Sequence, residues 1–294
     1  MRLLDVRRGR PAPSRPAGRQ AVSRLLGLAL LALAAGQAAA AEPAGASRLQ
    51  PGQSCFRCDL RYESGQQMNL KQADLRGAYM YNVNLSHARL LDARLESSNL
   101  QMANLERADM TRARLDRAMV SEANLLGATL IGASLRQTVA RNSNFDGADL
   151  SAADMTTADL RDSSFINSFA EDANFMSADL QRSNFSAARM SGARFIGSDL
   201  SSATLSDAVL SHASLQRALL TAADMARANL AYANLTRALL QGANLRNADL
   251  TGANLTNADL READLTGAEM GSAVLEGALV CDAIFPNGTK KPPC

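Results

Sequence analysis

The sequence predicts an all-β solenoid, a chain that turns at short regular intervals and winds around one axis. Three observations lead to this fold class. An apolar residue, usually Leu, recurs every five residues; Ala precedes it by two positions; and polar or small residues follow it. The register holds from residue 68 to residue 285, and a fixed period of this kind is the signature of a repeat architecture.

The apolar positions are those whose numbers are multiples of five. Of the 44 such positions between residues 70 and 285, 28 are Leu, 6 Met, 6 Phe, 2 Val and 2 Ala. The 44 positions two residues earlier include 35 Ala. The segment 243–255 shows the consensus, which is Ala, Asn or Asp, Leu, and then two polar or small residues.

This period fits neither an α-helix nor a long straight strand. On a helix, five residues advance by about 140° net, so the leucines would leave no apolar stripe. On a strand, an odd period would place successive leucines on alternate faces. We therefore expect a turn after each Leu, with Ala and Leu facing a common axis. Glycine, a turn residue, is frequent there: Gly77, Gly127, Gly132, Gly147, Gly192, Gly197, Gly242, Gly252 and Gly267.

With these repeats the chain resembles the pentapeptide-repeat family. The resemblance implies a right-handed quadrilateral parallel β-helix in which four repeats form one coil, hence about eleven coils. It covers residues 55–285, with 55–67 as an irregular first coil. At 20-residue spacing two ladders are expected: Asn84, Asn104, Asn124, Asn144 and Asn184, interrupted by Ser164, and Asp159, Asp179 and Asp199.

The first 41 residues predict a secretory signal peptide. Seven arginines and one acidic residue precede or flank the apolar run 25–35, and alanines fill positions 38–41. The run is too short for a bilayer, which needs about 20 residues. We expect export to the periplasm, or else secretion, followed by a linker at 42–54, the β-helix and a cap at 286–294.

Removal of the signal peptide reverses the net charge. The remaining residues hold 24 basic and 28 acidic side chains, a net charge of −4. This charge argues against a broad basic surface for nucleic acid. No other apolar stretch is long enough to span a membrane, so stable membrane insertion is not expected.

All four cysteines lie at the ends of the repeats. The ends of the coil stack would be roughly 50 Å apart, beyond the ~7 Å limit on the Cα separation of a disulfide. The predicted pairs are therefore Cys55–Cys58 and Cys281–Cys294. A redox-active Cys-x-x-Cys is the alternative, but no pattern predicts the helix N-terminus that lowers a thiol pKa. Asn287-Gly288 predicts a hairpin turn in the capping tail.

The sequence offers no catalytic constellation. His87 and His212 are 125 residues apart, and neither a phosphate-binding glycine loop nor a zinc-spaced cluster is present. We expect no enzyme activity, no cofactor and no metal.

Apolar residues interrupt the expected outer surface and could mark a partner site. Leu219 and Leu239 share one face on adjacent coils and form the candidate partner patch; Leu279, Met119 and Val139 lie on the same face. We expect Phe169 and Val139 to turn inward beside the small Ala170 and Ala140. We interpret the other interruptions as tolerated surface residues: Leu126, Ile131, Ile166, Met176 and Ile196.

These features predict a non-catalytic structural or protein-binding scaffold in the periplasm, with a protein as partner. One alternative comes from the resemblance, since some pentapeptide-repeat proteins mimic DNA and bind DNA gyrase. The other alternative is an envelope redox protein that uses Cys55 and Cys58.

Overall fold

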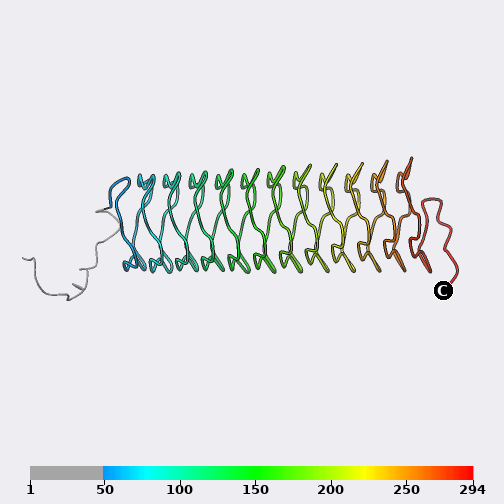
Figure 1. Cartoon of the computed structure of the whole chain (residues 1–294), viewed down its shortest axis with the longest axis horizontal. Coiled ribbons are helices and arrows are strands. Elements are labelled where there is room, and N and C mark those ends of the chain that lie inside the picture. Colours follow the sequence, from blue (N-terminus) through cyan, green and yellow to red (C-terminus); the bar gives the residue numbers. More distant parts are fainter. Residues whose placement is uncertain (1–48, 294) are drawn as a thin grey trace, which may run out of the picture. The chain divides into compact units, whose positions relative to one another are not determined.

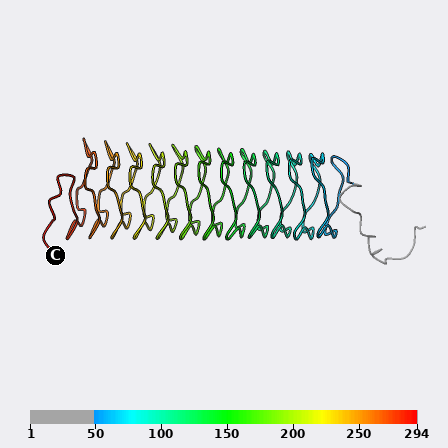
Figure 2. The same ribbon diagram turned by 180° about the vertical axis from the view of Figure 1, so that it is seen from behind.

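The computed structural model describes residues 49–293, which form a stack of similar coils (Figure 1 and, from behind, Figure 2). They belong to one compact unit, Ala41–Cys294. The predicted signal peptide and Cys294 lie outside the described residues, so the signal peptide stays a prediction.

Each coil contains 20 residues and four faces. Parallel β-bridges join residues 20 apart, such as Ser54 to Asp74 and Asp59 to Tyr79, and continue to Ile284. Each face is one bridge residue wide, and residues 49–293 contain neither a helix nor a longer strand. The predicted quadrilateral parallel β-helix is therefore confirmed, including the Asn84–Asn184 ladder with Ser164 in register.

A β-turn closes every repeat. In the first regular one, Ala73 N donates to Leu70 O at 3.0 Å, and Gln72 has a φ of +58°. Every residue whose number ends in 2 or 7, from 52 to 282, has a positive φ. A left-handed residue at the third position of a four-residue turn defines type II, so the glycines counted in the sequence occupy the position that favours them.

Hydrogen bonds tie each coil to both neighbours. Gln72 N donates to Leu91 O at 2.8 Å and Leu75 N to Arg94 O at 2.7 Å, both in the next coil. Asp74 N donates in the opposite direction, to Gln53 O at 3.0 Å. The backbone donors of each repeat are thus divided between the turn and the two adjacent coils, which satisfies buried backbone groups.

The Asn or Asp of the consensus caps the turn that follows it. Asn84 Oδ1 accepts a hydrogen bond from Ser86 N at 3.1 Å, and Asp249 Oδ1 accepts one from Thr251 N at 2.9 Å. This is an Asx-turn, in which a short polar side chain bonds the backbone two residues on. The local bond gives a physical reason for this preference in the consensus.

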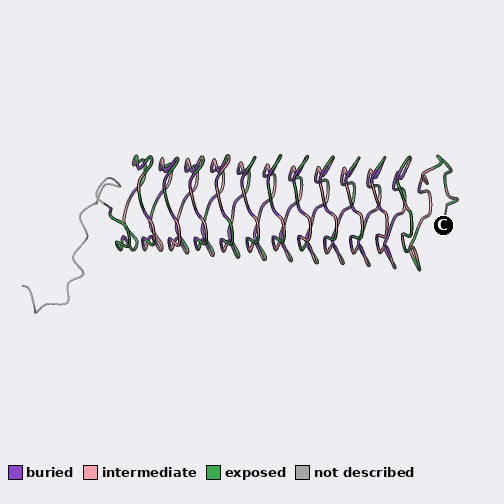
Figure 3. Cartoon of the chain, turned by 90° about the horizontal axis from the view of Figure 1, so that it is seen from above, coloured by how far each residue is buried: buried purple, intermediate pink, exposed green. Residues whose placement is uncertain are grey.

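The core is a continuous apolar column. The multiples of five from Leu70 to Leu265 are buried, together with most of the alanines (Figure 3). Five phenylalanines fill the middle of this column. Phe145, Phe165 and Phe185 stack at centroid distances of 4.8 and 4.5 Å, and Phe175 stacks on Phe195 at 4.8 Å. The inward assignment of the multiples of five is confirmed there.

The C-terminal tail folds back on the last coil. Ile284 and Lys290 form an antiparallel bridge, and Phe285 N donates to Thr289 O at 2.9 Å. Gly288 has a φ of +80° in the turn that Asn287-Gly288 predicted. Cys281 is not a free cysteine. Its predicted partner, Cys294, lies outside the described residues, so the Cys281–Cys294 disulfide stays a prediction.

Replacement of Leu205 by Asp is expected to destabilise the protein severely, by at least about 4 kcal/mol, because it removes a buried apolar side chain and buries an unpaired carboxylate. Urea unfolding followed by circular dichroism measures the change. Ala222→Asp, at an exposed turn position, is the control and should unfold like the wild type. Equal stability of Leu205→Asp and wild type would contradict the inward packing.

Two adjacent alanines test the turn. Ala152 has a φ of +55°, whereas Ala153 is buried in the core. Ala152→Gly should raise stability by about 0.5–1 kcal/mol, because relief of left-handed strain exceeds the entropic cost of glycine. Ala153→Gly should lower stability. Thermal unfolding of both variants checks the signs, and a loss of stability in Ala152→Gly would contradict the turn geometry.

Candidate functional site

One face of the coil stack carries both leucines of the predicted patch. We call it the Leu219 face and define it by its ladder of parallel bridges: Asp59, Tyr79, Asn99, Met119, Val139, Asp159, Asp179, Asp199, Leu219, Leu239, Asp259 and Leu279. Across the four faces, ten bridge positions between 54 and 284 hold an apolar or aromatic residue, and six of them are on this face. Apolar surface is therefore concentrated here.

The C-terminal part of the face contains the predicted pair. Leu219 and Leu239 are bridge partners on adjacent coils. Leu219 is half-buried, Leu239 is 42% exposed, and Leu279 two coils further is 49% exposed. Asp259 lies between the last two and is held by Arg261, whose Nε and Nη2 donate at 2.8 and 2.6 Å. The structure thus brings together the residues that the sequence placed on one face.

These leucines replace a capping residue. With Leu at positions 219 and 239, the backbone N–H groups of Thr221 and Gln241 have no side-chain acceptor within the described coils. A typical hydrogen bond contributes about 0.5–1.5 kcal/mol. Each leucine therefore forgoes a turn-stabilising bond and exposes apolar surface, a combination that packing within this chain does not explain.

An aromatic cluster at the N-terminal end of the face was missed by the sequence interpretation. Tyr79 is 53% exposed on the face itself. Beside it, Tyr62 and Tyr81 meet edge to face at 5.6 Å, and the Tyr81 hydroxyl donates to Met102 Sδ at 2.9 Å. The signal was available, because three of the four tyrosines in the chain fall between residues 62 and 81.

The centre of the face is an acidic ladder, Asp159, Asp179 and Asp199, as the sequence predicted. Two arginines partly neutralise it. Asp159 Oδ2 accepts from Arg141 at 2.6 Å and from Arg161 at 2.9 Å. Partial burial opposes ionisation, but the hydrogen bonds from Arg161 and Arg141 outweigh it and lower the pKa of Asp159 to about 2. The face therefore has apolar ends and an ionic centre.

Phe169 does not turn inward beside Ala170; that expectation is wrong. The residue is 40% exposed, and the guanidinium of Arg189 lies over its ring at 5.5 Å from the centroid. The adjacent interior is already filled by Phe165 and Phe175, which meet edge to face at 6.4 Å. Val139 likewise remains on the Leu219 face, half-buried.

The other interruptions do not form one patch. Leu126 and Ile166 share one edge of the coils, Met176 and Ile196 share another, and Ile131 lies on a third. Leu126 and Ile131 are each 39% exposed, whereas the remaining three are half-buried. Their scatter over several edges fits the interpretation as tolerated surface residues.

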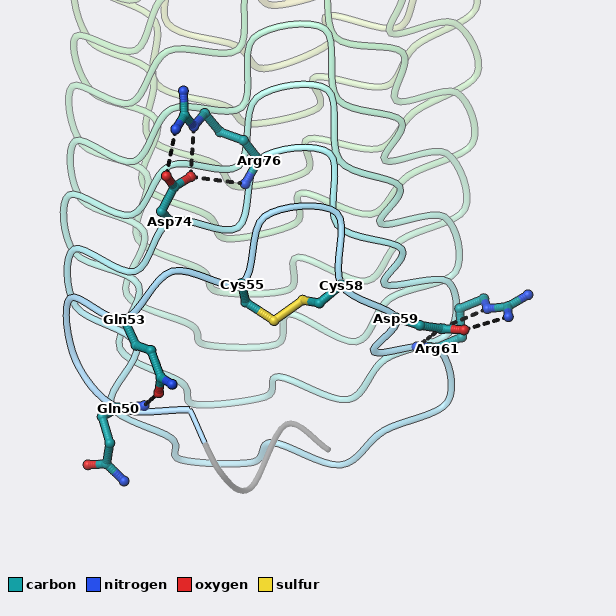
Figure 4. The surroundings of a disulfide bond; sticks show 8 residues. All are labelled: Gln50, Gln53, Cys55, Cys58, Asp59, Arg61, Asp74 and Arg76. Atoms are coloured by element: carbon teal, nitrogen blue, oxygen red, sulfur yellow. Dashed lines mark hydrogen bonds and ion pairs between the residues drawn. A yellow bond between two sulfur atoms is a disulfide. The ribbon is translucent and has the colours of Figure 1, made fainter. Parts of the chain in front are cut away.

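Cys55 and Cys58 are disulfide-bonded within a single turn of the first coil (Figure 4). Cys55 occupies a core position and is buried, and Cys58 N donates to Cys55 O at 3.2 Å to close the turn. The described residues provide no helix N-terminus beside the pair, which is the feature that usually lowers the pKa of a reactive thiol.

The two histidines occupy equivalent but distant turn positions. His87 and His212 both have a left-handed φ, of 58° and 59°. His212 stacks on Tyr232 at 5.2 Å. On the other side of that ring, a Cβ at Gly252 would come within 2.6 Å of Tyr232. Within residues 49–293 no group of three His, Cys, Asp or Glu side chains is arranged to hold a metal ion.

Removal of the Asp159 charge should give a stability loss that depends on pH. The pKa of Asp159 is about 2 in the folded protein against an ordinary 3.8, so its ionisation stabilises the fold above about pH 4 and this contribution disappears as pH falls through 2. Asp159→Asn should lower stability at pH 7 by up to about 2 kcal/mol. Denaturant unfolding at pH 7, 4 and 2 should show the difference shrinking.

Comparison with solved structures finds other repeat proteins. HetL, a pentapeptide repeat protein involved in heterocyst differentiation regulation from the cyanobacterium Nostoc sp. strain PCC 7120, is 32% identical over 76% of this chain and 92% of its own, with a TM-score of 0.37. A pentapeptide repeat protein from the Arabidopsis thaliana thylakoid lumen is 29% identical over 38% of this chain and 74% of its own, with a TM-score of 0.25.

QnrB1, a plasmid-mediated fluoroquinolone resistance protein, is 22% identical over 57% of this chain and 83% of its own, with a TM-score of 0.28. No curated protein sequence matches the chain. Among the described residues there is no helix with the length and apolar character needed to cross a membrane.

The family assignment rests on the repeats themselves. The model of pentapeptide repeats matches eight copies in segments that together run from residue 66 to residue 279, which is most of the chain. The matched segments are those in which the turns, the parallel bridges and the buried multiples of five recur. The chain belongs to the pentapeptide-repeat family and has that family's right-handed quadrilateral β-helix.

Proposed function

We propose that this protein is an exported, non-catalytic scaffold whose Leu219 face binds a protein partner in the periplasm. In this proposal the scaffold has about eleven coils, and residues 286–294 cap its C-terminal end. Protein binding is the role that the exposed chemistry of the described residues favours.

The observation that carries the proposal is the gathering of apolar and aromatic residues on the Leu219 face. Exposed apolar patches on a soluble protein commonly mark protein contacts, and tyrosine is enriched among residues that dominate binding energy. The face offers Tyr79 at one end, with Tyr62 and Tyr81 beside it, and leucines at the other end, with the Asp159–Asp199 ladder between them. A partner surface with apolar anchors and a basic centre would complement it.

The alternative of an envelope redox protein receives less support. A reactive Cys-x-x-Cys needs an accessible thiolate, whereas Cys55 is buried in the first coil. If the disulfide has only a structural role, the purified protein will not accelerate insulin reduction by dithiothreitol, and Cys55→Ser will change thermal stability instead.

The alternative of DNA mimicry also receives less support. Residues 49–293 carry 27 acidic and 23 basic side chains, so the net negative charge is small. Many carboxylates are paired with arginines, as Asp162 is with Arg182 and Asp207 with Arg227. A DNA duplex instead presents a regular, unneutralised charge along its axis. We expect the protein to leave gyrase supercoiling unchanged.

Site-specific crosslinking tests the proposed face. A photoreactive amino acid at Leu239 should form an adduct with a protein partner in intact cells, and one at Asn229, a bridge residue half a coil earlier on a different face, should not. Leu219→Ser with Leu239→Ser should reduce the affinity of the purified partner at least tenfold, because two apolar contacts are lost.

Circular dichroism of the double variant provides the control, since both leucines lie outside the core and the fold should persist. Equal adducts at positions 239 and 229, or unchanged affinity of the double variant, would contradict the proposed face. Cell fractionation tests export separately: the protein should be released with the periplasmic contents and should lack residues 1–41.

A further inference from the structure

A pocket lies at the corner of the coil stack beside the C-terminal part of the Leu219 face. Its volume is about 380 Å³, and turns of four successive coils line it: Ile196, Gln216, Arg217, Thr236, Arg237 and Asn257. We call it the arginine pocket, because its lining has two guanidinium groups and no carboxylate. Arg217 and Arg237 precede Leu219 and Leu239 by two residues, so the pocket and the leucine pair share the same coils.

The two arginines are an exception among the stacked turn residues. Three other arginines at the left-handed turn position have an aspartate one coil before them, and each forms a bidentate ion pair with it: Asp92–Arg112, Asp162–Arg182 and Asp207–Arg227. Arg217 is instead followed one coil later by Arg237, and neither side chain has a hydrogen bond, ion pair or ring contact with another described residue. Two like charges on adjacent coils repel each other, so this place favours an anion.

The carboxylates that flank the leucines on the face are already engaged. Asp199 and Asp259 precede and follow the leucine pair in the ladder of bridges. Asp199 accepts hydrogen bonds from Gln181 Nε2 at 2.6 Å and from Ser201 N at 2.9 Å, and Asp259 is paired with Arg261. The positive charge of the arginine pocket therefore remains available beside exposed apolar surface.

We propose that the arginine pocket binds a carboxylate of the protein partner, from an Asp or Glu side chain that lies next to the apolar residues contacting Leu219 and Leu239. This inference rests on the proposed function of the Leu219 face and defines the partner's chemistry. The planar fork of a guanidinium matches a carboxylate, and arginine is enriched among residues that dominate binding energy.

A peptide with acidic and apolar residues uses both parts of this surface. A nucleic acid would use the positive charge and leave the leucines exposed. An anionic membrane would contact the leucines but would bring lipid phosphates against the carboxylates of the same face, such as Asp199. The observations therefore favour an acidic peptide segment.

Selection from a phage-displayed library of random dodecapeptides on the purified, immobilised protein tests the proposal. We expect enrichment of peptides that combine Asp or Glu with large apolar residues. Enrichment of apolar peptides without acidic residues would overturn the carboxylate contact and leave the proposed function of the face standing. If no peptide is enriched, the inference is wrong, and crosslinking at Leu239 decides the proposed function separately.

Single variants test the two arginines with a fluorescein-labelled peptide from the selection, by fluorescence anisotropy at constant ionic strength. Arg217→Gln and Arg237→Gln should each weaken binding at least about tenfold, as expected for loss of a charge-assisted hydrogen bond. Gln137 has the same left-handed φ, so both variants should fold. Arg107→Gln is the matched control: Arg107 is also an exposed, unpaired turn arginine, but at the diagonally opposite corner, and its variant should bind like the wild type.

The peptide itself supplies a second test. Replacement of its Asp or Glu by the amide should weaken binding to the wild type about as much as Arg217→Gln does, and should have little further effect on that variant. Unchanged affinity of the amide peptide, or equal effects of Arg107→Gln and Arg217→Gln, would contradict the proposal. Tighter binding of a DNA duplex or of phosphatidylglycerol vesicles than of the peptide would assign the pocket to another class of partner and also contradict it.

Discussion

The structure depends on a type II turn that recurs every fifth residue. Its left-handed residue helps to turn the chain from one face of the coil to the next within four residues, and the same residue donates its N–H to the next coil, as Gln72 does to Leu91. This single conformation directs the Ala and Leu side chains inward and joins neighbouring coils. Non-glycine residues adopt it at a steric cost, which repetition of the packing and hydrogen bonds around them offsets.

The local chemistry of the repeat distinguishes positions that the fold requires from positions that are available for function. Close packing restricts inward positions to apolar residues and to small ones such as Ala and Ser. Bridge positions favour Asn or Asp because their side chains cap the next turn. A residue other than Asn or Asp at a bridge position is therefore informative about function. Leu219, Leu239 and Tyr79 give up a local hydrogen bond while remaining compatible with the coil, and all three lie on one face.

Ion pairing also varies along the surface. Pairs such as Arg182–Asp162 are bidentate, with two hydrogen bonds of 2.7 and 2.8 Å. Arg217 and Arg237 instead form no ion pair with a described residue. Exposed pairs contribute only about 0–1 kcal/mol to stability, so such differences can be accommodated by the fold without loss of the coil stack.

The sequence by itself determined the period, the inward residues, the turn positions and the face shared by Leu219 and Leu239, because every repeat sees the same local environment and a strict register places residue i above residue i − 20. Only the tertiary structure decided that Phe169 stays outside, since Phe165 and Phe175 already fill the interior. It also revealed the tyrosine cluster and the arginine pocket, because side chains from several coils meet there and no five-residue pattern encodes which ones remain unpaired.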